Sequence, residues 1–280
     1  MPSGAVELSV EDLYCSFRDL QGHPLPVLAG ISLSASENEF VAIVGPSGCG
    51  KSTLFNVAAG LVLPESGSVR LNGVDIAGSP GHVAYMMQKD LLLAWRTIAD
   101  NVTLGPELAR KPRSSYRDRA LDLMRRFGLE GFEHFYPSAL SGGMRQRAAL
   151  MRTILCDKSL LLLDEPFGAL DALTRAAMQE WLLDIWHDFR RTVLFITHDP
   201  EEAVFLADRI YVLTSRPARV KGIVPVSLGR PRSHKTIATL QFAQLKRQVL
   251  DLVWDEGADA LRGRLGPEGP PAAGASRENR

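Results

Sequence analysis

The sequence contains little cysteine and lacks any long apolar run. Its three cysteines, Cys15, Cys49 and Cys156, are widely spaced, which excludes a disulfide-rich scaffold and favours reduced thiols in the cytosol. It has no CxxC pair and no His/Cys cluster, so a metal site built from protein ligands alone is not indicated. The apolar run at 160–163 is far shorter than the ~18–20 residues that span a bilayer, and the first residues lack a basic region followed by an apolar run. We therefore expect neither a membrane span nor a secretory signal.

An excess of charge of either sign is also missing. The 280 residues carry 32 Lys+Arg and 32 Asp+Glu, so the formal net charge is zero. This balance does not favour a polyanionic partner, and we expect no nucleic acid to bind. Hydrophobic residues make up 45% and charged residues 23%, which is ordinary for a globular protein and excludes a disordered or collagenous chain.

The apolar pattern predicts an α/β protein. Apolar and polar residues alternate in short runs before residue 40, which predicts antiparallel strands with a loop at 19–26. The continuous apolar run 40–44 predicts a strand buried on both faces, followed by a helix at 52–61. Further along, helices at 141–155 and 175–189 alternate with strands at 160–163 and 192–196. Strands that alternate with helices imply a parallel sheet wrapped by helices.

The remaining segments divide the chain. Residues 89–140 are expected to be helical with breaks and are locally basic; this region is either a solvated helical surface or a surface near a membrane or partner. Phe242, Leu245, Val249 and Leu252 have helical spacing. The Pro/Gly/Ala-rich end is expected to be disordered. We therefore predict a domain at 6–235, an amphipathic helical extension at 236–264 and a disordered tail at 265–280.

Residues 45–52, GPSGCGKS, match the phosphate-loop pattern G-x-x-x-x-G-K-[ST]. The loop follows a predicted buried strand and precedes a predicted helix, which is the required context. Its glycines let backbone N–H groups point at phosphate oxygens, and the helix adds its positive end. Lys51 would reach the β- and γ-phosphates, and the Ser52 hydroxyl would bind Mg²⁺. The alternative is a chance glycine-rich turn, and Cys49 is most simply a small residue in the loop.

A second motif places two acids directly after the apolar strand 160–163. Alone, this could be any buried strand that reaches a surface turn. Beside a phosphate loop, Asp164 would hold the Mg²⁺ shell through water. Glu165 would polarise an attacking water as a general base.

A third element, Leu140 to Arg147 (LSGGMRQR), resembles the LSGGQ signature of ABC-type ATPases. Gln88, the segment GALD at 168–171 and the segment ITHD at 196–199 follow the order of that family, and the resemblance covers about residues 6–230. It implies the P-loop ABC ATPase fold: a mostly parallel sheet wrapped by helices, an N-terminal antiparallel β subdomain and an inserted α-helical subdomain at about 89–155. Asn38 replaces the usual Gly of a turn, which Asn tolerates because it can adopt the left-handed conformation.

The signature has a physical interpretation of its own. Ser141 is a good helix N-cap, and Gly142 and Gly143 expose N–H groups at the positive end of that helix. This makes a second anion site on the same chain. The resemblance explains it, since two ABC subunits pair head to tail and each ATP lies between the phosphate loop of one and the signature of the other.

The resemblance also implies roles for single residues. Phe17 would stack on adenine, although Tyr14 is an alternative and an aromatic there is otherwise more often core. Gln88 would touch Mg²⁺ or the attacking water and sense the transporter contact; Asp171 would cross the dimer interface; His198 would contact the γ-phosphate. The catalytic set is Lys51, Gln88, Glu165 and His198, and the metal set is Ser52, Gln88 and Asp164. The predicted nucleotide contacts are Phe17, Gly45, Pro46, Ser47, Gly48, Cys49, Gly50, Lys51, Ser52, Thr53, Ser141, Gly142, Gly143 and Asp171.

The segments 89–97 and 215–220 most resemble the nitrate/sulfonate/taurine importers, a group that includes importers of thiamine-precursor pyrimidines. The resemblance implies the ATPase subunit of a bacterial importer, peripheral on the cytoplasmic face of the inner membrane. Its partners would be a second copy, an integral membrane permease and, indirectly, a solute-binding protein. The alternatives are a soluble ABC ATPase without a transport role, a phosphate-loop kinase and a nonenzymatic nucleotide binder. The sequence does not name the transported molecule.

Overall fold

The computed structural model describes residues 5–264, which form two β-sheets and their covering helices. The larger sheet has six strands in the order β10-β9-β3-β8-β7-β6. Neighbouring strands from β9 to β6 pair in parallel, whereas β10 is antiparallel to β9. In chain order the strands are β3 (Phe40–Val44), β6 (Ala84–Met86), β7 (Leu160–Asp164), β8 (Thr192–Ile196), β9 (Arg209–Leu213) and β10 (Val220–Pro225).

The smaller sheet is antiparallel and has the order β2-β1-β4-β5. The predicted N-terminal antiparallel region is therefore confirmed. The loop between its first two strands is shorter than the predicted 19–26, because pairing continues as far as Arg18 and Pro24. The turn at Asn38 has the expected left-handed backbone, with φ 59°. The strands are β1 (Val6–Arg18), β2 (Pro24–Ser36), β4 (Ser66–Leu71) and β5 (Val74–Asp75).

Strand β3 separates two hydrophobic cores. All five of its residues are buried, as predicted, and alternate side chains point to opposite faces of the sheet. Phe40 and Val44 pack among the helices on one face. Val41 and Ile43 pack on the other face with α1 (Lys51–Ala58) and the antiparallel sheet. Helix α1 is thereby enclosed between the two sheets, which fixes the loop that precedes it.

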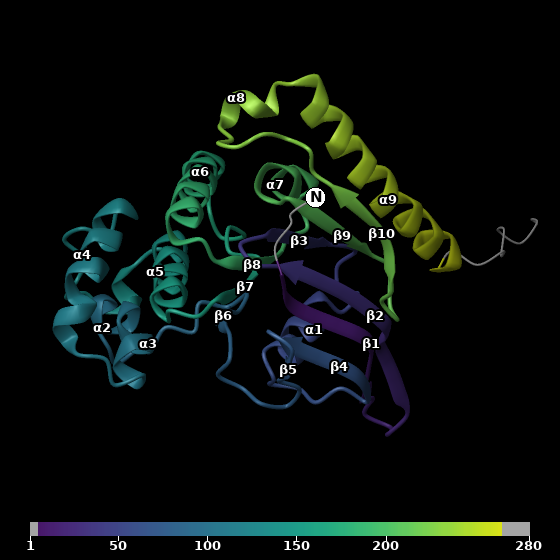
Figure 1. Cartoon of the computed structure of the whole chain (residues 1–280), viewed down its shortest axis with the longest axis horizontal. Helices are drawn as coiled ribbons and strands as arrows, with labels where there is room; N and C mark the ends of the chain where they lie inside the picture. The colour runs from purple at the N-terminus through teal and green to yellow at the C-terminus, as the bar shows by residue number, and fades with distance from the viewer. Residues whose placement is uncertain (1–4, 265–280) are drawn as a thin grey trace, which may run out of the picture.

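The other helices lie around the larger sheet (Figure 1). Helices α2, α3 and α4 lie together at the left of the view beside α5, and α9 runs along β10 on the opposite side. Within residues 5–264, no helix combines the length and apolarity needed to cross a bilayer. The bounds are α2 (Ile98–Val102), α3 (Leu104–Leu108), α4 (Arg117–Arg126), α5 (Gly142–Leu155), α6 (Ala172–Phe189), α7 (Pro200–Leu206), α8 (His234–Ile237) and α9 (Leu240–Arg264).

The predicted fold class is confirmed, although one predicted helical stretch is wrong at its start. Residues 89–97 are not helical, and the first helix of that region is α2. The cause is Asn101, which is fully buried and whose side-chain amide donates to the carbonyls of Leu93, Arg96 and Thr97. The Asn101 side chain also accepts from the N–H of Leu93 at 2.7 Å, so it fixes this stretch in a non-helical conformation. The predicted tail 265–280 lies outside the described residues, and the division at 235 and 264 stays a prediction.

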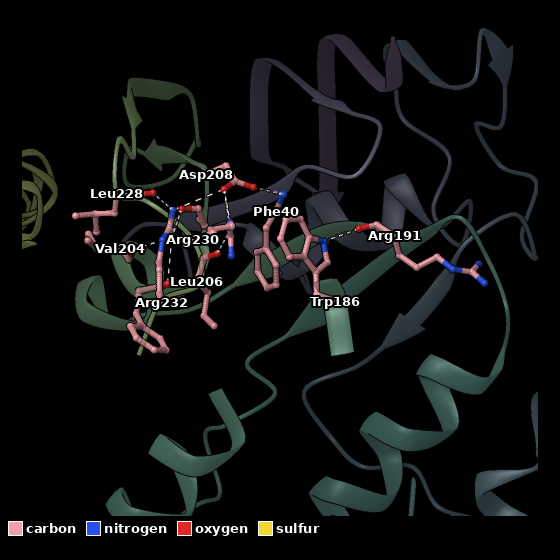
Figure 2. A network of polar contacts seen from close by, with 11 residues as sticks. Phe40, Trp186, Arg191, Val204, Leu206, Asp208, Leu228, Arg230 and Arg232 are labelled. Atoms are coloured by element: carbon pink, nitrogen blue, oxygen red, sulfur yellow. Dashed lines mark hydrogen bonds and ion pairs between the residues drawn. The ribbon is translucent and has the colours of Figure 1, made fainter. Parts of the chain in front are cut away.

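Two arginines that follow the last strand cap the carboxyl end of α7 (Figure 2). The last carbonyl groups of a helix have no helical partner, and a positive charge there is favourable. Arg230 donates to the carbonyl of Leu206 at 2.8 Å. Arg232 is 5% exposed, and burial lowers its pKa to about 10, so it stays charged at neutral pH. It donates to the carbonyls of Val204 (3.2 Å), Phe205 (3.0 Å), Ala207 (2.8 Å) and Leu228 (3.2 Å).

The same arginine pair is tied to the sheet and to α6 (Figure 2). The Asp208 carboxylate accepts from Nε of Arg230 at 2.9 Å and from the N–H of Phe40 at 3.0 Å. The Arg230 guanidinium lies 4.2 Å from the ring centre of Trp186, a cation–π distance. Residues 230–232 thus fasten three elements of the domain, β3, α6 and α7.

We predict that Arg232→Met lowers the free energy of unfolding by about 1–3 kcal/mol, because several buried carbonyls lose their donor. Urea denaturation monitored by circular dichroism measures this change. The control is Arg247→Ala, whose side chain is 83% exposed and forms an ion pair with Asp251 of the same helix; it should change stability by less than about 0.5 kcal/mol. Equal midpoints for Arg232→Met and the unmodified protein would contradict the capping role.

Candidate functional site

The predicted site residues meet at one edge of the larger sheet because its strands are parallel. The carboxyl ends of parallel strands lie at the same edge, where open α/β sheets bind their ligands. Ile43 pairs with Ile196, and Ile196 pairs with Asp164, so the ends of β3, β8 and β7 are in register. Met86 of β6 pairs with Leu163. The phosphate loop, Gln88, Glu165 and His198 each follow one of these strand ends.

The phosphate loop adopts the backbone that its glycines permit. Gly48 and Gly50 have φ of 73° and 126°, a region that L side chains rarely adopt. A Cβ on Gly50 would come within 2.8 Å of a Val27 methyl carbon, so the turn also lacks room for a side chain. Lys51 is 7% exposed, and its ammonium donates to the carbonyls of Gly45 (2.8 Å) and Pro46 (2.9 Å). Loop and lysine are therefore held together as a unit.

Cys49 in this loop is buried, and burial raises the pKa of its thiol. A raised pKa disfavours the reactive thiolate. This agrees with the interpretation of Cys49 as a small residue rather than a redox group.

The loop opens into a cavity of about 330 Å³ between the strand ends. A volume of this size is in the range of small-molecule sites. The cavity is lined by residues from the loop, from the Gln88 segment and from the end of β7. It is also lined by Arg216, which sequence reasoning did not place at the site. Its lining residues are Ser47, Gly48, Gly50, Lys51, Ser52, Thr53, Gln88, Glu165 and Arg216.

Asp164 and Ser52 form an oxygen-rich corner beside this cavity. Asp164 is 2% exposed and is hydrogen-bonded with the side chains of Ser52 and Tyr85. Burial raises its pKa above the usual value, although these hydrogen bonds oppose the shift. A cation next to this carboxylate would offset its burial. Carboxylate and hydroxyl oxygens are the ligands that Mg²⁺ prefers, so this donor set fits the predicted metal.

Glu165 is contacted by two of the three other residues that were predicted to be catalytic, Gln88 and His198. Its Oε2 accepts from Nε2 of Gln88 at 3.1 Å, and its Oε1 lies 3.4 Å from Nδ1 of His198. Its backbone has φ 49°, an uncommon and costly conformation for a residue other than glycine. Glu165 lines the cavity, whereas Asp164 is buried and is not among its lining residues. The arrangement can position a water and accept its proton.

Three residues of α5 contact either Glu165 or the segment that follows Gln88. Sequence reasoning did not assign a role to any of them. Gln146 is 5% exposed, and its Nε2 donates to the backbone carbonyl of Glu165 at 3.3 Å. Arg145 binds the Asp90 carboxylate at 3.0 Å. Arg152 donates to the carbonyls of Asp90 (2.6 Å) and Leu91 (2.8 Å). For Gln146 the available signal was a polar residue at a core position of the helix, which requires a partner.

The signature itself has the predicted local structure. Ser141 caps α5, and its Oγ accepts from the N–H of Met144 at 3.3 Å. Ser141 and Gly142 are exposed, and neither they nor Gly143 line the cavity of their own chain. Asp171 likewise caps α6 by accepting from the N–H of Thr174 at 3.0 Å; its hydrogen bonds with Thr174 lower its pKa. The residues of the predicted second anion site therefore lie outside the cavity of their own chain.

The predicted adenine contact lies on the antiparallel sheet. Phe17 and Tyr14 are both on β1, and they are 44% and 40% exposed, so neither is a core residue. Tyr14 turns its hydroxyl toward Gly30, where an added Cβ would lie 3.0 Å from that oxygen. Neither side chain lines the cavity, and the stacking role of Phe17 stays a prediction.

A buried strand, a glycine loop around Lys51 and a following helix define a phosphate-loop nucleotide-binding protein. Residues 28–168 match the family model described as ABC transporter. The chain belongs to the ABC transporter ATP-binding family, and the ATPase activity of that family follows with it. Its Asp164–Glu165 pair and Ser141–Gly143 signature lie within the matched residues.

Three curated relatives are similar over most of the chain. An uncharacterized ABC transporter ATP-binding protein of Methanocaldococcus jannaschii is 43% identical over 92% of this chain and 95% of its own length. The formylaminopyrimidine import ATP-binding protein ThiZ of Halalkalibacterium halodurans is 42% identical over 82% of this chain and 91% of its own. The taurine import ATP-binding protein TauB of Yersinia pestis is 43% identical, covering 80% and 86%.

A solved structure has a similar fold. It is the dimeric post-hydrolysis state of the ATP-binding cassette MJ0796 bound to ADP and Pi, with a TM-score of 0.70 and 26% identity. The match covers 79% of this chain and 100% of the MJ0796 chain. That cassette is therefore a nucleotide-bound dimer built on this fold.

We predict that Lys51→Ala weakens ATP binding by about 10- to 100-fold, because a charge-assisted bond to phosphate contributes roughly 1.5–3 kcal/mol. Calorimetric titration with ATP measures the affinity. Lys51 also braces Gly45 and Pro46, so thermal melting should be recorded to confirm that the variant folds. Lys235→Ala, which removes an exposed lysine of α8, is the control and should bind like the unmodified protein. Unchanged binding by Lys51→Ala would contradict the nucleotide site.

Proposed function

We propose that this chain is the ATP-hydrolysing subunit of a bacterial ABC importer. The observation that carries the proposal is the meeting of Gln88, Glu165 and His198 above the phosphate loop, while the signature faces away from the same cavity. The meeting of these three side chains supports hydrolysis, and the outward position of the signature supports a dimer. Import is supported by the relatives ThiZ and TauB, whose names describe import of a formylaminopyrimidine and of taurine.

Nucleotide binding begins at the phosphate loop. Backbone N–H groups around Gly48 and Gly50, together with the amino end of α1, would receive the phosphates. The Lys51 ammonium would give up part of its hydrogen bonding to the Gly45 and Pro46 carbonyls and donate to the terminal phosphates instead. Phe17 would cover the adenine from the antiparallel sheet.

Ser52, Gln88 and Asp164 would hold Mg²⁺ beside the phosphates, with Asp164 acting through water. The ion would neutralise charge on the phosphate oxygens and orient them. The hydrogen bond between Ser52 and Asp164 already places both oxygen ligands together.

Glu165 would accept the proton of the attacking water. Gln88 and His198 contact one carboxylate oxygen each, so the carboxylate has a fixed orientation before substrate arrives. His198, with a side chain 61% exposed, would reach the γ-phosphate at the cavity mouth. A base positioned in this way contributes on the order of 10²–10⁴-fold to rate.

The signature would complete the site of a second copy. A helix N-terminus with exposed N–H groups favours an anion, and the cavity of the same chain does not include it. A two-fold head-to-tail pair gives each cavity the signature of its partner with one self-complementary contact. Asp171 would lie at the same interface. The dimeric state of the MJ0796 cassette supports this assembly.

The segment that follows Gln88 is the proposed contact for an integral membrane permease. Leu91 and Trp95 are 52% and 74% exposed there, and large exposed apolar side chains are frequent anchors of interfaces. Arg145 and Arg152 link this segment to α5, so permease contact and signature would move together. The chain would then lie peripherally on the cytoplasmic face of the cell membrane, with a solute-binding protein as an indirect partner. The proposed solute class is a small sulfonate, nitrate-like anion or pyrimidine.

We predict that Glu165→Gln binds ATP normally but hydrolyses it about 10²–10⁴-fold more slowly, because the amide cannot accept the proton. Phosphate release measures turnover, and size-exclusion chromatography with ATP should show a persistent dimer. Glu180→Gln, at a partly exposed position of α6 outside the cavity, is the control. Turnover by Glu165→Gln at the unmodified rate would show that another group is the base.

We also predict that the chain co-purifies with an integral membrane permease from detergent-solubilised membranes. Trp95→Ala should reduce the recovered permease about 10-fold, since loss of an interface anchor costs roughly 1–2 kcal/mol. Trp254→Ala is a matched control, because Trp254 is also 74% exposed but lies on α9. Recovery of ribosomes or DNA without a permease would favour the soluble ABC ATPase instead.

A further inference from the structure

Arg216 lies in the turn between β9 and β10. β9 is the fifth strand that ends at the edge where the nucleotide site forms. β9 is parallel to β3, with Val212 opposite Val44, so the hairpin after β9 rises beside the phosphate loop. The hairpin is fastened to β2: Ala29 donates to the carbonyl of Ala218 at 3.0 Å, and Ala218 donates to the carbonyl of Val27 at 2.8 Å.

The guanidinium of Arg216 is directed at the phosphate loop. Its Nη2 donates to the carbonyl of Gly48 at 2.9 Å, and the residue lines the cavity together with Lys51 and Ser52. A guanidinium is planar and can donate from several N–H groups, so a bond to Gly48 leaves it able to bind a ligand as well. Arg216 is exposed rather than buried in the hairpin, so the core does not account for its position.

We propose that Arg216 is a nucleotide-binding residue that donates to the phosphates of ATP from the side opposite the Gln88 segment. The inference deepens the nucleotide site proposed above and rests on it. No motif of the phosphate loop, the signature or the strand ends β3, β7 and β8 includes this residue.

The charges around the cavity favour this role. Lys51 is the cation that the loop itself supplies, while Asp164 and Glu165 place negative charge at the β7 side. The polyphosphate of ATP adds more negative charge to the same space. A guanidinium binds phosphate oxygens through two parallel N–H groups and is more weakly hydrated than an ammonium, so it suits this position.

A role confined to bracing the loop is the competing explanation, since Arg216 already holds Gly48. The two roles differ in what a substitution must preserve. Bracing requires only a donor for the Gly48 carbonyl, whereas phosphate binding requires positive charge. Arg216→Gln keeps a donor without the charge, and Arg216→Lys keeps both.

The experiment is calorimetric titration of Arg216→Gln, Arg216→Lys and Arg216→Ala with ATP and with ADP. We expect Gln and Ala to weaken binding about 10-fold or more and Lys to restore most of the affinity, in keeping with a charge-assisted bond. The loss for Arg216→Gln should shrink as salt concentration rises, because salt screens the charge on an exposed group. Arg219→Ala removes an exposed arginine of the same hairpin that does not line the cavity, and it should bind like the unmodified protein.

Affinity of Arg216→Gln equal to that of the unmodified protein would overturn the phosphate contact. Equal losses for Gln and Lys, without salt dependence, would overturn it in favour of a structural role. Lys51→Ala separates this failure from failure of the site as a whole. If Lys51→Ala loses affinity while all Arg216 variants bind normally, only the inference on Arg216 is wrong; if Lys51→Ala also binds normally, the proposed pocket is wrong.

Discussion

The parallel direction of β6, β7, β8, β3 and β9 is the constraint on which the site depends. Gln88, Glu165, His198, the phosphate loop and Arg216 are distant in sequence, yet each follows a strand that ends at the same edge. The direction is set by the crossover connections, since an inverted strand would require a different connection to its neighbour. Packing of the core thus brings the site together, and a few polar residues at the strand ends supply its chemistry.

Backbone geometry supplies much of the remaining function. Glu165 has a left-handed backbone, and Gly48 and Gly50 have conformations that few other residues adopt. Ser141 and Asp171 direct the amino ends of two helices by capping them. The left-handed backbone of Glu165 lowers the stability of the fold, so the surrounding core must hold this turn in place. The two helix caps increase stability. In the proposed dimer the outward signature makes each chain half of a complete ATP site, and the similar MJ0796 cassette is dimeric.

The fold and the main motifs could be predicted because they depend on local patterns. The run 40–44 is apolar throughout, and GPSGCGKS follows it directly, so strand and loop are identified together. The segment 89–97 was not predictable in the same way, because its non-helical conformation is fixed by hydrogen bonds to one buried side chain, Asn101, which lies beyond the segment. Gln146 and Arg216 were missed for a related reason: each acts through a carbonyl far away in sequence, Glu165 or Gly48, and no local pattern records such a contact. The sequence predicted that Ser141 caps the signature helix. That the signature does not line the cavity of its own chain could be seen only in the tertiary structure.

The arginine cap on α7 connects residues beyond the matched family model to the ATP-binding fold. The family model ends at residue 168, but the carbonyls at the end of α7 find their donors only at Arg230 and Arg232. A chain cut before Arg230 would keep every ATP-binding motif and yet leave the end of α7 and one face of Trp186 without their arginine partners. The segment between β10 and the final helix is therefore more than a connection, because its arginines supply the donors that the end of α7 lacks.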